Sequence, residues 1–216
     1  MTDYSKWDNY SIGNIHYVKE HRDNIARIAF IDYILKNDID NILEIGPGEL
    51  IEAQEILKQK KVKYSVLDVS KTFLKHCESL NIVECFEGEM HKTTFLDKQF
   101  NLVYMSSVIE HTPDLNKTIS ELSRISKTYY ITMFKWFMKS GDLDITYSES
   151  KKFYSSTFNI FKLLDLLQKS SIIHKKIIGM KQENIMIDFD DYVKNMDNSI
   201  DLHRNGNHLS VIGEWK

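Results

Sequence analysis

One stretch, Asn41 to Leu50 (NILEIGPGEL), constrains the fold more than any other part of the chain. Apolar residues precede an acid, Glu44, and a Gly-Pro-Gly turn leads into an apolar pattern of helical spacing. This order predicts a strand, a tight turn and a helix, which together form the first half of a βαβ unit. Gly46 and Gly48 lack a Cβ, so their backbone can turn sharply and approach a ligand closely.

The acid before the turn indicates which ligand the turn receives. The start of a helix leaves N–H groups unpaired, and these groups face whatever lies over the turn. A carboxylate at Glu44 would repel the phosphate of a dinucleotide, whereas it suits a ligand that carries a cationic ammonium group. A purely structural turn between a strand and a helix is the alternative.

The same stretch resembles the first motif of the class I S-adenosylmethionine (SAM)-dependent methyltransferases, whose pattern is acid-x-Gly-x-Gly-x-Gly. Glu44, Gly46 and Gly48 match this pattern, and Leu50 stands where the third glycine usually lies. The resemblance implies SAM as the cofactor. It also implies an α/β, Rossmann-like fold with a seven-stranded, mostly parallel sheet, helices on both faces and an antiparallel last strand.

The segment KYSVLDVS (Lys63 to Ser70) is typical of a buried strand that ends in an acid, Asp68. An acid at this strand end can accept two hydrogen bonds from a ribose diol. The resemblance implies that Asp68 binds the SAM ribose and that Val69 lies beside the adenine. A solvated loop carboxylate is the alternative for Asp68.

A helical run from Lys71 to Leu80 leads to a third predicted strand, NIVECFEGEM. In the family that the chain resembles, an acid after this strand accepts from the adenine amino group and its neighbour packs on the ring. Glu89 and Met90 occupy these positions. Glu87 competes with Glu89 for the role, and core packing is the alternative for Met90.

The segment FNLVYMSSVIEHTPD (Phe100 to Asp114) resembles the family's fourth strand and the turn that follows it. Ser106 falls at the carboxyl end of this strand, beside the expected cofactor. His111 is the nearest candidate base for a hydroxyl acceptor, and an orienting or structural role is its alternative. Thr112 is predicted to cap the next helix, with Pro113 at its first position.

The resemblance covers about residues 41–133, because ELSRIS (Glu121 to Ser126) matches the family's Glu-x-x-Arg helix end and TYYITMF predicts a fifth strand. Beyond it, Phe158 to Ser170 has helical periodicity, and two later segments, IIHKKIIGM and HLSVIGEWK, are typical of strands. NIMIDF is expected to pair with or extend the first of them.

We expect a single methyltransferase domain over residues 1–216. Residues 1–36 are expected to form an N-terminal helical lid, 37–134 the cofactor-binding half, and 135–216 the acceptor half with an insertion. Trp7 and Tyr10 belong either to this lid or to a plug on the domain surface.

The net charge and the distribution of charged and apolar residues indicate which kinds of partner the chain is expected to bind. The net charge of −3 and the scattered lysines indicate no nucleic-acid partner, and no apolar run is long enough to span a membrane. We therefore expect a cytoplasmic protein without a membrane partner. Cys77 and Cys85 are expected to be reduced thiols, and no metal site is predicted.

The expected partner is a small-molecule acceptor, and the prediction is O- or N-methylation of a sugar or nucleotide-linked metabolite. The acceptor is expected to be held by segments that match the family poorly, with side chains that suit an anionic or sugar-bearing molecule: Tyr147, Lys151, Lys152 and Tyr154. A non-catalytic SAM-binding subunit is the alternative. A nucleotide-dependent oxidoreductase is less favoured, because Glu44 opposes phosphate and the third glycine is missing.

Overall fold

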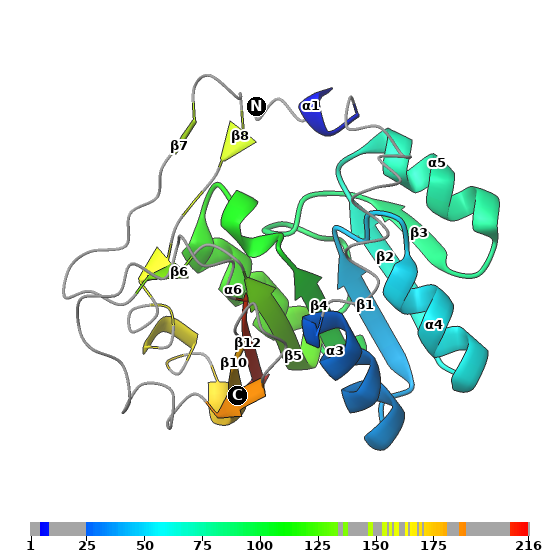
Figure 1. Cartoon of the computed structure of the whole chain (residues 1–216). Helices are drawn as coiled ribbons and strands as arrows, with labels where there is room; N and C mark the ends of the chain where they lie inside the picture. Colours follow the sequence, from blue (N-terminus) through cyan, green and yellow to red (C-terminus); the bar gives the residue numbers. More distant parts are fainter. Residues whose placement is uncertain are drawn as a thin grey trace.

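The computed structural model contains a central eight-stranded sheet, which is made of β1 (Asn41–Ile45), β2 (Lys63–Asp68), β3 (Glu84–Glu87), β4 (Phe100–Ser106), β5 (Ser126–Met133), β10 (Ser171–Met180), β11 (Met186–Asp188) and β12 (His208–Trp215) (Figure 1). The strands lie in the order β11-β10-β12-β5-β4-β1-β2-β3. The structure describes residues 5–8, 25–133, 136–137, 147–148, 153–154, 156, 158–159, 163, 165–167, 169, 171–180, 186–188 and 208–215.

The half of the sheet from β3 to β5 is parallel. Its inner strands are buried on both faces, which explains their apolar runs. Ile45 at the end of β1 pairs with Leu67 of β2 and Met105 of β4, so the carboxyl ends of these strands are level. The strand order reverses at β1, between β2 and β4. In open α/β sheets the crevice at such a point receives the ligand.

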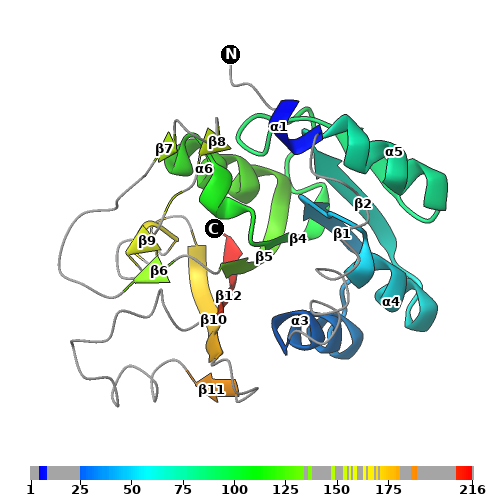
Figure 2. The same ribbon diagram turned by 45° about the horizontal axis from the view of Figure 1, so that its top comes forward.

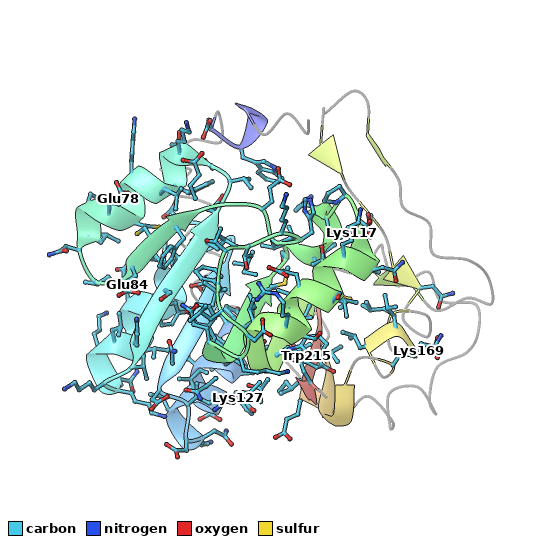
Figure 3. All side chains as sticks on the ribbon, turned by 180° about the vertical axis from the view of Figure 1, so that it is seen from behind. Glu78, Glu84, Lys117, Lys127, Lys169 and Trp215 are labelled. Carbon is cyan, nitrogen blue, oxygen red and sulfur yellow. The ribbon has the colours of Figure 1, made fainter. Side chains whose placement is uncertain are left out.

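Helices cover both faces of this parallel half. The helices α3 (Ile25–Lys36), α4 (Ile51–Gln59) and α5 (Lys71–Leu80) pack on one face, where residues such as Phe30, Ile56 and Cys77 join one hydrophobic cluster. The helix α6 (Leu115–Ile125) covers the other face, which Figure 3 shows from its own side. Its buried residues recur at helical spacing, because an amphipathic helix turns one stripe toward the core.

The start of α6 differs from the prediction that Thr112 caps it and Pro113 opens it. The helix begins at Leu115, and its N-cap is Asp114, whose carboxylate accepts from the Lys117 N–H at 3.0 Å. The Thr112 hydroxyl is instead buried against the hydroxyl of Thr118. The prediction was wrong because Asp114 is an equally good cap two residues later.

The other end of the sheet is antiparallel, as predicted for the last strand. β12 runs antiparallel to β5 and β10, and β11 pairs with the other edge of β10. The sheet therefore has eight strands, one more than the seven predicted. The Trp215 indole N–H donates to the Ser126 hydroxyl at 2.9 Å, which ties the end of β12 to the start of β5. Figure 2 shows β10 and β11 on the side of the molecule away from α4 and α5.

Two shorter strand pairs complete the described structure. β6 (Trp136–Phe137) pairs with β9 (Phe158–Asn159), and β7 (Tyr147–Ser148) pairs with β8 (Phe153–Tyr154). Several residues singled out in the sequence lie outside the described residues: Tyr10, Lys151, Lys152 and most of the insertion.

No helix within the described ranges is long and apolar enough to cross a membrane. The His, Cys, Asp and Glu side chains of the same ranges do not gather in any group of three that could hold a metal ion.

Candidate functional site

The turn between β1 and α4 has the sharp backbone that its glycines predicted. Gly46 and Gly48 both adopt positive φ values, +66° and +52°. A Cβ on Gly46 would lie 2.5 Å from a methyl carbon of Val108, whereas a Cβ on Gly48 would meet no atom within 4 Å. The first glycine is therefore needed for packing against the segment after β4. The second leaves open space above the turn.

Leu50 departs from the family pattern, and the structure shows how it is accommodated. It also has a positive φ of 59° and serves as the N-cap of α4. Its side chain is fully buried in the cluster between α3, α4 and the sheet. A left-handed backbone at a non-glycine residue costs on the order of 1 kcal/mol, and this burial offsets it.

Glu44 lies beneath the turn, with only 2% of the residue exposed. Its carboxylate accepts from the Tyr64 hydroxyl at 2.9 Å. Close by, Glu52 of α4 accepts from Arg27 of α3 at 2.7 Å and from the Tyr104 hydroxyl at 3.3 Å. We call these five side chains, of which Arg27 is partly exposed and the other four are buried, the Glu44 cluster. It joins β1, β2, β4, α3 and α4 directly below the turn.

Sequence reasoning identified Glu44 but missed the other members of this cluster. Alternation along β2 places Tyr64, Val66 and Asp68 on one face, which was a usable signal for Tyr64. Glu52 and Arg27 are separated by 25 residues, and no local pattern predicts their pairing.

Asp68 stands at the carboxyl end of β2, next to the turn. The Gly46 N–H donates to the Leu67 carbonyl at 2.9 Å, which joins the start of the turn to the residue before Asp68. The Asp68 carboxylate accepts from the Ser70 N–H at 2.8 Å. Burial raises the pKa of Asp68 to about 6, despite hydrogen bonds from the Ser70 and Val69 backbone that lower it.

Two of the residues predicted to meet the adenine, Glu89 and Met90, lie on the loop after β3, whereas the third, Val69, directly follows β2. The first residue of that loop, Gly88, donates its N–H to the Asp68 carbonyl at 3.0 Å, so this loop starts beside the end of β2. Glu89 pairs with His91 at 2.9 Å, and half-buried Met90 packs on the core cluster of the α6 face. Glu87, the competing candidate, is more exposed and faces Lys71 at 3.8 Å.

A clamp from α6 holds this loop in place. Glu121 accepts from the Thr93 N–H and hydroxyl at 2.7 and 2.6 Å, and it also pairs with Arg124 at 2.8 Å. Arg124 in turn donates to the Phe95 carbonyl and to Asp97. Hydrogen bonds, chiefly from Arg124, lower the pKa of Glu121 to about 2. The Glu-x-x-Arg pattern thus connects the helix to the loop that carries Glu89 and Met90.

The carboxyl end of β4 brings Ser106 and His111 to the same edge of the sheet. Ser106 is half-buried at the last position of β4. His111 ends a short 3-10 helix, η1 (Ile109–His111), that begins next to Val108, the residue packed against Gly46. His111 is also half-buried.

The short helix α1 (Ser5–Asp8) bridges the two sides of the site. Asp8 accepts from the Ser70 hydroxyl at 3.0 Å and from the Thr72 N–H at 3.3 Å at the start of α5. Trp7 makes an edge-to-face contact with the His111 ring, with 4.8 Å between ring centroids. Figure 1 shows α1 on the side of the sheet to which the arrowheads of β1 and β4 point.

Comparison with known proteins identifies this arrangement. The model of a methyltransferase domain family matches residues 43–129, the span from β1 to β5. No curated protein matches the chain. The solved structures similar to it share the fold at low sequence identity.

Three of them illustrate this. A SAM-dependent methyltransferase of Thermotoga maritima has a TM-score of 0.67 and 14% identity, with 99% of each chain covered. The N-terminal domain of EvdMO1 with S-adenosylhomocysteine (SAH) bound has a TM-score of 0.62 and 13% identity, covering 90% of this chain and 82% of its own. A methyltransferase in complex with the Haloferax volcanii Trm112 activator has a TM-score of 0.63 and 11% identity, covering 88% of each.

The matched domain begins in the strand that carries Glu44 and includes Asp68, Glu89 and His111. The mostly parallel sheet and its antiparallel last strand are those that the resemblance implied. Residues 43–129 thus match a methyltransferase domain, and the chain shares the Rossmann-like fold of solved SAM-dependent methyltransferases.

Proposed function

We propose that the protein transfers the methyl group of SAM to a small-molecule acceptor, by O- or N-methylation of a sugar or nucleotide-linked metabolite. One observation carries this proposal: the glycine turn after β1 and Asp68 at the end of β2 lie at neighbouring strand ends, joined by the 2.9 Å hydrogen bond from Gly46 to Leu67. That juxtaposition suits a ligand with an ammonium group at one end and a ribose at the other.

The chain offers a group for each part of this cofactor. In the proposal, Glu44 is the carboxylate for the ammonium group, and Asp68 accepts from the ribose diol. The backbone of Gly46 and Gly48 makes the close approach possible. Three side chains after the second and third strands are proposed to contact the adenine: Val69, Glu89 and Met90. Ser106 is proposed to lie beside the cofactor.

Bound SAM supplies a methyl group that its positive sulfur has already activated. The protein therefore has to hold the acceptor in line with the carbon–sulfur bond and keep water out, and such positioning can supply several kcal/mol of the barrier. Trp7 covers His111 from α1 and is suited to exclude water there. His111 is proposed to take the proton of a hydroxyl acceptor as general base.

The acceptor is proposed to bind between η1 and the β7–β8 pair. The Ser156 N–H donates to the Glu110 carbonyl at 2.8 Å, which holds the chain just after β8 against the residue before His111. Tyr147 and Tyr154 are directly opposite each other in this strand pair. A sugar acceptor is consistent with the EvdMO1 domain studied in the presence of D-fucose, and an amine with the histamine named for the Thermotoga protein.

A labelled-SAM assay over sugars, nucleotide sugars and amines tests the proposal. With the best hydroxyl acceptor, His111→Ala should lower kcat roughly 100-fold, because a general base contributes about that much, while SAH affinity is retained. An unchanged kcat would assign His111 an orienting or structural role instead.

The second candidate is a SAM-binding subunit without its own catalysis. One comparison favours this candidate: a methyltransferase of the same fold forms a complex with the Haloferax volcanii Trm112 activator. SAH binding without methyl transfer to any acceptor would support this candidate. Binding of NAD but not of SAH would overturn both and favour an oxidoreductase.

A further inference from the structure

The Glu44 cluster contains more acid than base. Glu44 and Glu52 are only 2% and 3% exposed, and the one cation among the five side chains is Arg27, which donates to Glu52. Asp68 adds a further carboxylate near Glu44. Among the described residues, the remaining titratable groups that face the cluster are neutral at pH 7 and bring no positive charge: Tyr64, Tyr104 and, on α5, Cys77.

An uncompensated carboxylate in such a place is costly, because burying a charge without a partner costs several kcal/mol. Arg27 compensates Glu52 directly. Glu44 has a hydrogen bond from the Tyr64 phenol, which helps a carboxylate but carries no charge. Burial, and then repulsion by Glu52, raise the pKa of Glu44 well above its ordinary value. A protonated Glu44 removes the excess negative charge.

We propose that the Glu44 cluster holds one proton while the cofactor site is empty, and that the cofactor's ammonium group releases this proton to solvent when it binds. The neutral carboxylic acid and the ammonium cation become a carboxylate–ammonium pair plus one free proton, so charge and atoms balance. The inference rests on the proposed function, because it takes Glu44 as the partner of the ammonium group.

The proposal predicts how binding depends on pH. Below the pKa that Glu44 has in the empty protein, the proton must leave, so affinity should rise about tenfold per pH unit. Above that pKa, Glu44 is already ionised and affinity should become independent of pH. The useful range ends at about pH 7, because the cofactor's amino group loses its own proton above that value.

Calorimetric titration with SAH at about pH 5.5 to 7, in buffers of different ionisation enthalpy, counts the released protons. Methylthioadenosine has the ribose that Asp68 is proposed to bind but no ammonium group, so any proton that it releases comes from Asp68. At the acid end, SAH should release close to one proton more than methylthioadenosine does. SAH binding with no release at any pH would overturn the inference and leave the proposed function intact. Failure of SAH to bind would overturn both.

Glu52→Gln is the sharpest variant, because it removes the repulsion and leaves Arg27 to favour ionised Glu44. This variant should still bind SAH, but at about pH 5.5 its Glu44 should release less than half as much proton as in the wild type. Glu55→Gln is the matched control one turn along α4, where Glu55 is exposed and paired with Lys58. It should release as many protons as the wild type. Equal release in both variants would contradict the proposal.

Two more variants identify the source of the proton. Asp68→Asn should bind SAH more weakly but still release the proton of Glu44, whereas loss of all release in this variant alone would assign the proton to Asp68 and overturn the inference. Tyr64→Phe removes the hydrogen bond to ionised Glu44. It should shift the proton release to higher pH, which keeps the inference testable if Glu52→Gln does not fold.

Discussion

At the level of single residues, the carboxylate of Asp68, our proposed partner of the ribose, is buried at a cost to the fold. Its pKa of about 6 lies above the ordinary value of 3.8, and burial is the main cause. Because the folded-state pKa is raised, this group favours folding most at a pH below about 4, and the contribution is lost as the pH rises through about 6. At neutral pH the buried charge therefore destabilises the protein.

Asp68→Asn should accordingly raise the free energy of unfolding at pH 7 by about 1–3 kcal/mol. At a pH below 3.8, the ordinary pKa of an aspartate, the substitution should bring no gain. The same change should weaken SAH binding by roughly 1.5–3 kcal/mol, because an amide is a poorer acceptor than a carboxylate. Urea unfolding and calorimetry measure the two effects. A variant with unchanged SAH affinity would remove Asp68 from the cofactor site.

The two glycines of the turn should respond differently to alanine. Gly46→Ala combines a positive φ with a clash against Val108 at 2.5 Å, so it should lower the free energy of unfolding by roughly 2–4 kcal/mol. Gly48→Ala meets no atom and should cost only about 1 kcal/mol of backbone strain. Its Cβ nevertheless enters the open space above the turn, so SAH binding should weaken. Equal stability losses in urea unfolding would contradict this distinction.

At the scale of elements, α6 does more than cover one face of the sheet. Its Glu121 and Arg124 hold the loop from Thr93 to Asp97, and this loop follows directly on Glu89 and Met90. The helix therefore supports the adenine end of the proposed site without reaching the ligand.

Glu121→Gln tests this clamp. The depressed pKa of about 2 means that ionised Glu121 stabilises the fold above about pH 4.5, and that this contribution is lost as the pH falls toward 2. The variant should lose about 1–2 kcal/mol of unfolding free energy at pH 7, and the difference should vanish near pH 2. Lys58→Ala breaks an exposed pair of the same kind and should cost under about 0.5 kcal/mol. A loss independent of pH would indicate packing instead of charge.

At the level of the whole molecule, the proposed cofactor site and the proposed acceptor site lie on different parts of the fold. The parallel strands β1 to β4 carry the proposed cofactor groups on level carboxyl ends. The short β7–β8 pair stands beside η1, apart from that sheet, and Figure 1 shows it near α1. Recognition of the acceptor is expected from these outer segments, where variation disturbs the core little.

A double variant, Tyr147→Ala with Lys151→Ala, should therefore raise the acceptor KM or lower kcat about tenfold or more, while SAH affinity stays within about twofold of wild type. Methyl-transfer kinetics and calorimetry separate the two readouts. Parallel loss of SAH binding and turnover would instead assign this segment to the cofactor site or to folding.

Features that depend on neighbouring residues could be predicted from the sequence alone. The strand, glycine turn and helix around Gly46 were predicted because apolar spacing and missing Cβ atoms act locally. The helix α5 was predicted at its observed bounds, and the parallel half of the sheet followed from the family resemblance. Local competition still misplaced one boundary, since Asp114 and not Thr112 caps α6.

Only the tertiary structure decided which distant side chains meet. Tyr64 reaches Glu44 across 20 residues of sequence, Arg27 reaches Glu52 across 25, and Asp8 reaches Ser70 across 62. No periodicity encodes such pairs, because they form when several elements pack on one sheet. Burial has the same origin, since a carboxylate acquires a raised pKa only when packing removes its water. The proton that we assign to Glu44 thus depends on the assembled fold.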